Sequence, residues 1–326
     1  MRAVSLAVLL VAAPAAADTT VKIAALAPEG SSWMKLFRQW QQAVEKRTEG
    51  RVKLKFYPGG VQGDERDVLR KIKLGQLSGA AVTGIGLSAI NPEVRTLDIA
   101  RTYEQLDGLR AALGDTLTKK FDEKGYVLLG WGDVGPVHIF SKTPVRSIED
   151  LRKTKLWVWS DDPISRQLIE SLGVRGVPMG VPDVLPALST GQVDAFFGTP
   201  LSTLALQWSG HAKYVTTLVV SQATGATVVA KKVWEAIAPA DRAAIVDEGQ
   251  KMQAAVLAQV RADNAKAMAT MKAKGLEVIE TPATMAKVFD ERIEAVARES
   301  GKKLDPDFVA RVDKLVSDYR AAQAKR

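Results

Sequence analysis

The stretch "RVKLKFYPGGVQGDERDVLRKIKLGQLSGAAVTG", residues 51–84, contains a strand, a glycine-rich turn, a helix and a second strand in succession. Residues 51–57 alternate charged and apolar side chains, which is the period of a half-buried strand. Apolar residues then recur at helical spacing from about Asp64 to Leu74. The apolar run Ala80–Thr83 predicts a short buried strand. A strand, helix and strand in this order predict parallel pairing through a helical crossover.

The residues before this stretch extend the same pattern. "VKIAALA", residues 21–27, predicts a buried strand, and residues 32–48 carry apolar side chains at helical spacing. Together they give a β-α-β-α-β order. We therefore expect a mostly parallel sheet with helices on both faces.

The alternation repeats later in the chain as a second lobe. A helix near residues 105–123 is followed by five strand-like runs with helices among them: "YVLLGWG", "PVHIFS", "LWVW", "VRGVP" and "VDAFF". From about residue 239 the sequence becomes helical, and a helix over residues 240–274 is long enough to cross both lobes. Two α/β lobes usually leave a cleft between them.

The first 17 residues have the pattern of a secretory signal. Arg2 precedes an apolar run from Ala3 to Ala13, and small residues lead to a predicted cleavage after Ala17. The apolar run is too short for a lasting membrane anchor. The chain has no cysteine, which excludes disulfides, thiolate ligands and a lipid-attachment cysteine. We therefore expect a free periplasmic protein.

Charge and composition narrow the classes of partner and cofactor. The formal charge is +8, but 45 Lys and Arg are mixed with 37 Asp and Glu without a long basic block. This favours a solvated basic surface over nucleic-acid binding. No zinc, calcium or full phosphate-loop motif is found, so we expect no metal and no cofactor. Asp161 and Asp162 precede Pro163 and are interpreted as caps of a helix.

An enzyme is the weaker alternative. The two histidines are His138 and His211, and a hydrolase could be built from His138 with Ser160 and Asp133. No nucleophile-elbow sequence surrounds Ser160. A hydrogen-bonded structural role for His138, inside the strand "PVHIFS", is the preferred interpretation.

Ordered motifs over nearly the whole chain resemble a known family. They include "FRQWQQAVEKRTEGRVKLKFYPGG", "KTPVRSIEDLRKTKLWVW", "GVRGVPMGVPDVLPALSTGQVDAFFGTP" and "HAKYV". The chain resembles the solute-binding proteins of tripartite ATP-independent periplasmic (TRAP) transporters, the DctP-like group. The resemblance implies a periplasmic-binding-protein-like α/β fold, with two lobes around a cleft and a long bracing helix. It also implies closure around a small-molecule ligand, which passes to membrane-embedded TRAP carrier subunits.

The resemblance suggests how the chain divides. We expect a signal peptide over residues 1–17. Lobe I takes residues 18–133 with a returning segment near 221–240, and lobe II takes residues 134–220 with part of 241–326. Residues 240–326 form a helical region that braces both lobes.

This sequence departs from the family pattern at the ligand contacts. In most members the strand after the "DL" helix carries an arginine that pairs with a substrate carboxylate, and Trp157 stands there instead. No asparagine follows the strand at Asp194, and Val137 lies near where many relatives have an arginine. Replacing a guanidinium by an indole removes a bidentate acid clamp. The resemblance therefore predicts a neutral, apolar or aromatic ligand rather than a simple carboxylate.

Alternation places the two indoles of "LWVW" on one face of the strand, toward its carboxyl end, where open α/β sheets bind ligands. An arginine from elsewhere, Arg101, Arg166 or Arg175, could restore acid binding. The predicted ligand-contacting aromatic residues are Trp157, Trp159, Phe196, Phe197, Trp131, Trp33 and Trp208.

A second function keeps the fold and changes the role. The chain could be a periplasmic carrier or sensor that hands an apolar ligand to a different partner. The resemblance also implies a helical-repeat accessory protein as a partner, since some relatives work with proteins of this kind.

Overall fold

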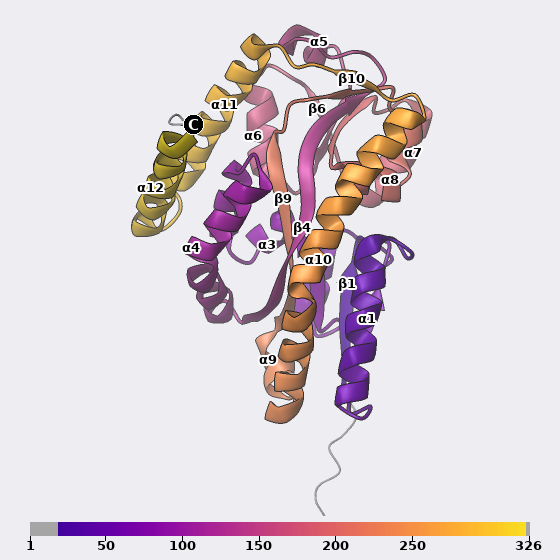
Figure 1. Ribbon diagram of the computed structural model, residues 1–326, viewed down its shortest axis with the longest axis vertical. Coiled ribbons are helices and arrows are strands. Elements are labelled where there is room, and N and C mark those ends of the chain that lie inside the picture. The colour runs from indigo at the N-terminus through magenta and orange to yellow at the C-terminus, as the bar shows by residue number, and fades with distance from the viewer. Residues whose placement is uncertain (1–18, 324–326) are drawn as a thin grey trace, which may run out of the picture.

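The computed structural model describes residues 19–323, so the predicted signal peptide, residues 1–17, lies outside the described part of the chain (Figure 1). The strands are β1 (Thr19–Ala25), β2 (Val52–Tyr57), β3 (Gly79–Thr83), β4 (Tyr126–Ser141), β5 (Leu156–Trp159), β6 (Gly176–Met179), β7 (Ala195–Gly198), β8 (Tyr214–Thr216), β9 (Ser221–Ala230) and β10 (Glu277–Ile279). The α-helices are α1 (Ser32–Arg47), α2 (Glu65–Lys73), α3 (Gly84–Ser88), α4 (Tyr103–Glu123), α5 (Ile148–Arg152), α6 (Pro163–Ser171), α7 (Val181–Thr190), α8 (Pro200–Ala205), α9 (Lys231–Glu235), α10 (Pro239–Ala273), α11 (Ala283–Gly301) and α12 (Pro306–Gln323). Two 3-10 helices are η1 (Pro92–Ile99) and η2 (Trp208–His211).

Within residues 19–323, ten strands form one sheet. Its main order is β2-β1-β3-β9-β4-β7-β5-β6, and β8 pairs with both β4 and β10. We call the part built on β1, β2, β3 and β9 lobe I, and the part built on β5, β6 and β7 lobe II. In lobe I, β1 is parallel to β2 and β3, and in lobe II, β5 is parallel to β6 and β7. The predicted two-lobed α/β fold class is confirmed.

Strand β4 belongs to both lobes. Two separate strands were expected here, but residues 126–141 form one strand with register shifts between Leu128 and Gly130 and between Asp133 and Gly135. Residues up to Val137 pair antiparallel with β9, and from His138 onward the partner is β7. Gly135 has a φ of 128°, and a Cβ there would lie 2.5 Å from the amide nitrogen of Asn264. Glycine therefore lets β4 bend against α10.

The long helix α10 runs beside β4 and α1 along the molecule (Figure 1). Its bounds are within one residue of the predicted helix over 240–274. The indole nitrogen of Trp40, on α1, donates to the carbonyl of Ile245 at 3.1 Å, and the backbone nitrogen of Leu201, on α8, donates to Asn264 Oδ1 at 3.0 Å. One helix is thus bonded to an element of each lobe.

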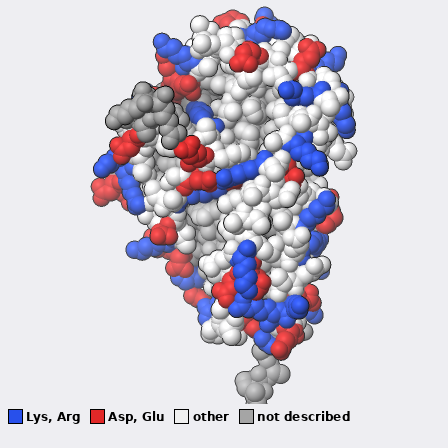
Figure 2. Space-filling model, viewed as in Figure 1, with Lys and Arg blue, Asp and Glu red and all other residues white. Residues whose placement is uncertain are grey.

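The strand "LWVW" divides its side chains between two apolar clusters, as its alternation predicts. Leu156 and Val158 pack with the α5, α6 and α11 side, whereas Trp157 and Trp159 pack with the α7 and η2 side. Helix α12 packs against α4, with Phe308 in the lobe I core. On the face that Figure 2 shows, Lys and Arg are interspersed with Asp and Glu.

Candidate ligand-binding cleft

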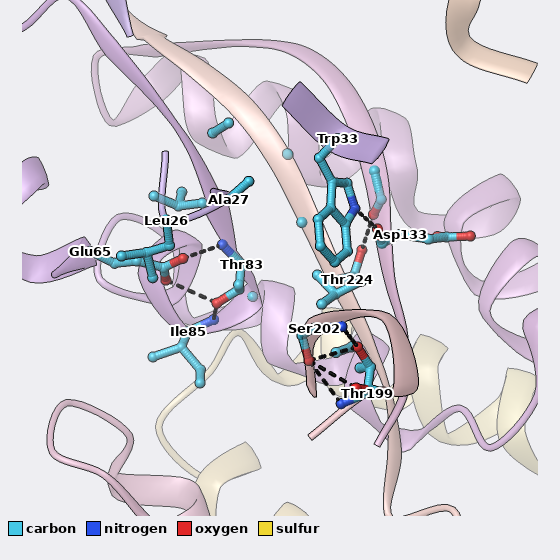
Figure 3. A pocket seen from close by; sticks show the side chains of 18 of the residues that line it. Leu26, Ala27, Trp33, Glu65, Thr83, Ile85, Asp133, Thr199, Ser202 and Thr224 are labelled. Carbon is cyan, nitrogen blue, oxygen red and sulfur yellow. Dashed lines mark hydrogen bonds between the residues drawn. The ribbon is translucent and has the colours of Figure 1, made fainter. Parts of the chain in front are cut away.

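A cavity of about 340 Å³ lies between the two lobes. Its walls come from β1, β3, β4, β9, α1 and α10 on one side and from β5, β7 and η2 on the other. Figure 3 shows Glu65 and Thr83 of lobe I across from Thr199 and Ser202 of lobe II. Ligand sites are characteristically concave and mostly apolar, with a few placed polar groups, and this cavity fits that description.

Indole rings form the lobe II wall. The Trp157 ring lies 6.0 Å from that of Trp159 and 5.2 Å, edge-on, from that of Trp208. Trp157 is only 5% exposed, and its indole nitrogen donates to the carbonyl of Met179 at 3.1 Å. The Trp159 indole reaches across the cleft and donates to Asp64 Oδ2 at 2.7 Å. These bonds fix the rings without using a ligand.

Six of the seven predicted aromatic residues line the cavity: Trp33, Trp131, Trp157, Trp159, Phe197 and Trp208. Phe196 lies in the core instead. It is fully buried, stacked on Phe140 at 5.3 Å, and does not line the cavity. Because side chains alternate along β7, only one of the two phenylalanines can face the cleft. Ligand contact by the six residues stays a prediction.

Asp133 lies in the wall beside two of these tryptophans. The Trp33 indole donates to the Asp133 carbonyl at 3.0 Å, as Figure 3 shows. The Asp133 carboxylate accepts from Arg110 at 2.6 Å and from Arg261 at 2.6 Å. Its negative charge is therefore matched inside the protein, and the arginines that match it do not line the cavity.

Glu65 is a buried carboxylate in the lobe I wall. The pattern of aromatic residues in the sequence does not indicate that it lies at the cavity. The Glu65 carboxylate accepts hydrogen bonds from the backbone nitrogen of Thr83 at 2.7 Å and from the Thr83 hydroxyl at 2.9 Å (Figure 3). It also accepts from the backbone nitrogen of Gly86 at 2.7 Å. Burial raises the pKa of the Glu65 carboxyl to about 7, and the three hydrogen bonds offset only part of that rise. This carboxylate ties α2 to β3 and α3.

The raised pKa makes stability depend on pH. The folded chain binds the Glu65 proton more tightly than the unfolded chain, so the free energy of unfolding should fall as pH rises from about 4.5 to about 7, by up to roughly 3 kcal/mol. Urea unfolding at several pH values measures this fall. In Glu65→Gln the fall should disappear, whereas Glu49→Gln, at an exposed carboxylate, should keep it. An unchanged pH slope in Glu65→Gln would contradict the assignment.

Arg95 is the single basic side chain among the described residues that line the cavity. Its guanidinium is buried and pairs with Asp98 at 2.5 Å and with Asp162 at 2.8 Å. Arg101, Arg166 and Arg175, the arginines considered from the sequence, do not line the cavity. Arg101 donates to the carbonyl of Val220 and Arg166 to that of Ser160. The cavity thus offers no unpaired guanidinium among its described lining residues.

The hydroxyl groups of the wall bond to the protein itself. Thr199 and Ser202 form a reciprocal cap at the start of α8, and the Thr224 hydroxyl donates to the carbonyl of Gly132 at 3.3 Å. The Ser202 hydroxyl accepts from the backbone nitrogen and the hydroxyl of Thr199 and donates to the Thr199 carbonyl, so it is fully used. The Thr199 and Thr224 hydroxyl oxygens each accept one hydrogen bond and retain one lone pair for a further partner. The wall can therefore offer a neutral ligand a few hydroxyl contacts.

His138 has the structural role that the sequence favours. Its Nδ1 lies 3.1 Å from the carbonyl oxygens of both Thr216 and Leu218, and the residue does not line the cavity. Burial lowers the pKa of the imidazole, and the two carbonyl contacts only partly offset this. Ser160 also lies outside the cavity lining. The residues nominated for a hydrolase are not assembled at the cleft.

A two-lobed α/β fold with a largely apolar cavity between its lobes defines a ligand-binding protein of the periplasmic type. Residues 23–304 match the family model described as bacterial extracellular solute-binding protein, family 7, DctP. The chain therefore belongs to the DctP family of TRAP solute-binding proteins, which are receptors and not enzymes. The predicted family and the prediction of a non-catalytic protein are confirmed. Solute-binding proteins of this family bind small molecules and work with membrane TRAP subunits.

Individual relatives agree with this placement. A solute-binding protein of Verminephrobacter eiseniae is 27% identical over 274 residues, which are 82% of this chain and 81% of the relative. A TRAP periplasmic solute-binding protein of Ralstonia eutropha H16, with bound (S)-2-acetolactate, is 25% identical, with a TM-score of 0.84 over 92% of this chain and 99% of that one. One from Pseudomonas putida F1, with bound D-glucuronate, is 24% identical, with a TM-score of 0.83 over 90% and 97%. Within residues 19–323, no helix is long and apolar enough to cross a membrane.

Proposed function

We propose that this receptor captures a small neutral ligand with an apolar or aromatic body, rather than a simple carboxylate. The observation that carries the proposal is the state of Arg95, whose charge is already matched by two carboxylates of the protein. A ligand carboxylate would enter a cavity without a free cation and beside the buried Glu65. Burying an unpaired charge in a protein interior costs on the order of several kcal/mol.

The ligands of the solved relatives weigh against this proposal. The Ralstonia eutropha and Pseudomonas putida proteins bind (S)-2-acetolactate and D-glucuronate in their structures, and both ligands are acids. These proteins are 25% and 24% identical to this chain, so most of their residues differ and the class of ligand can differ as well. Trp157 supports that difference, because it replaces the arginine expected from the family pattern with an indole that faces the cavity.

The proposal extends to the site and the cell compartment. We infer that the six aromatic residues at the cavity wall contact the ligand as the lobes close, and that a ligand touching both lobes stabilises the closed form. Residues 1–17 would direct export and be removed, leaving a free periplasmic receptor. Transfer to membrane TRAP carrier subunits would follow. Participation of a helical-repeat accessory protein stays a prediction from the resemblance.

Ligand extraction tests the proposal directly. The protein is purified from its own periplasm without refolding, denatured and extracted with organic solvent, and molecules present in stoichiometric amount are identified by mass spectrometry. We expect a neutral molecule, and less of it from Trp131→Ala, which removes part of the wall. Trp234→Ala is the matched control, because Trp234 is a partly buried indole outside the cavity. A small organic acid in stoichiometric amount from the unaltered protein would refute the proposal.

A further inference from the structure

The Arg95–Asp162 ion pair joins the two lobes at the cavity. Arg95 lies on η1 of lobe I, and Asp162 is the residue before α6 of lobe II. The two guanidinium nitrogens Nη1 and Nη2 contact the two carboxylate oxygens at 2.8 and 3.2 Å. Both side chains are buried, and both residues line the cavity. Two parallel bonds of this kind are also how an arginine binds a ligand carboxylate.

The Asp162 carboxylate is held in place by its own lobe. Its Oδ1 accepts from the backbone nitrogens of Ile164 and Ser165 at 3.1 and 3.2 Å, and its Oδ2 accepts from the Ser165 hydroxyl. These bonds cap α6 and do not involve Arg95. Contacts within lobe II alone therefore position the Asp162 carboxylate.

The Nε donor of the guanidinium is occupied as well. Arg95 Nε donates to Asp98 Oδ2 at 2.5 Å, within the same 3-10 helix. Asp98 thus belongs to lobe I, whereas Asp162 comes from the opposite lobe. Only the pair with Asp162 depends on how the two lobes meet.

We propose that Asp162 is a specificity-determining residue, because its carboxylate occupies the Arg95 guanidinium and thereby excludes an acidic ligand. In this view lobe II supplies the carboxylate that an acidic ligand would otherwise bring. A neutral ligand can then be enclosed without leaving a buried charge unpaired. The inference rests on the proposed function in that it takes the cavity as the ligand site and a neutral molecule as its ligand.

Removing the internal carboxylate tests the inference. In Asp162→Ser a hydroxyl still caps α6, since serine is a preferred residue there, but the carboxylate is gone. We expect acetate to bind this variant at least about tenfold more tightly than the unaltered protein, because two guanidinium nitrogens become free. Acetamide, which has the same shape without the charge, should bind both proteins equally. Titration calorimetry and the shift in thermal midpoint measure each case.

The adjacent aspartate provides the control. Asp161 pairs with the exposed Arg66 at 2.9 Å and does not line the cavity, so Asp161→Ser should leave acetate binding unchanged. A folded Asp162→Ser protein that binds acetate no better than Asp161→Ser overturns the inference. If Asp162→Ser does not fold, Asp162→Asn is held to the same comparison. The extraction experiment uses no acetate, so an acid found there refutes the proposed ligand class separately from this result.

Discussion

Asp133→Ala is expected to lower the free energy of unfolding by about 3–5 kcal/mol, the range for breaking a buried ion pair by removing one partner. The Asp133 side chain is fully buried, and that of Arg110, which it neutralises, is 8% exposed. Alanine leaves this guanidinium buried without its counter-ion. The second partner, Arg261, also loses its Asp133 contact but keeps Asp107. The change should appear as a lower urea midpoint at constant slope.

A matched control separates burial from charge. Asp107 is also bonded to Arg261, at 2.6 Å, but its side chain is 49% exposed. Exposed pairs contribute about 0–1 kcal/mol, so Asp107→Ala should have a small effect. Equal losses in the two variants would show that the buried position of Asp133 does not matter, contrary to the structure.

Trp157→Ala should lower the free energy of unfolding by about 3–5 kcal/mol, as large-to-small changes of buried aromatic residues do. The Trp157 ring packs against Trp159 and Trp208, and alanine would leave a gap beside both. The same gap would enlarge the cavity and remove part of its proposed ligand contact. We therefore expect the affinity for the extracted ligand to fall with stability.

The variant Trp157→Phe separates the stability contributed by ring packing from that contributed by the indole N–H hydrogen bond. Phenylalanine keeps an aromatic ring but loses the hydrogen bond to the Met179 carbonyl, which still accepts from the backbone nitrogen of Ser160. The loss should therefore cost about 0.5–1.5 kcal/mol, the net range for one hydrogen bond. Denaturant unfolding of both variants, followed by ligand titration at a temperature where both are folded, gives the comparison. If phenylalanine were as harmful as alanine, the hydrogen bond rather than ring packing would hold this wall.

Much of the fold follows from local patterns in the sequence. Helices α1, α2 and α10 lie within one or two residues of their predicted bounds, because apolar periodicity and capping residues are local signals. Asp162 caps α6, as the order aspartate then proline predicts. The shared face of Trp157 and Trp159 follows from strand alternation alone.

Other features depend on register and on distant partners. Whether Phe196 or Phe197 faces the cleft depends on how β7 pairs with β4, which its own four residues do not encode. The single strand β4 continues through a register shift between Asp133 and Gly135, where the sequence predicts a break between two strands. Arg95 and Asp162 are 67 positions apart, so their pairing has no local signal. The sequence identifies Asp162 as a helix cap, but it gives no sign that this carboxylate also pairs with Arg95 of η1.

The place of β9 in the sheet also determines when the chain can fold. β9, residues 221–230, lies between β3 and β4, although it begins 142 residues after the start of β3 and 95 residues after the start of β4. A chain that stops near residue 133 would leave the inner edge of β3 without a partner, and unpaired edges promote misassembly. The first lobe therefore cannot complete its sheet as a nascent N-terminal fragment. Its folding must wait for a segment that follows most of the second lobe, and long-range contacts of this kind slow folding.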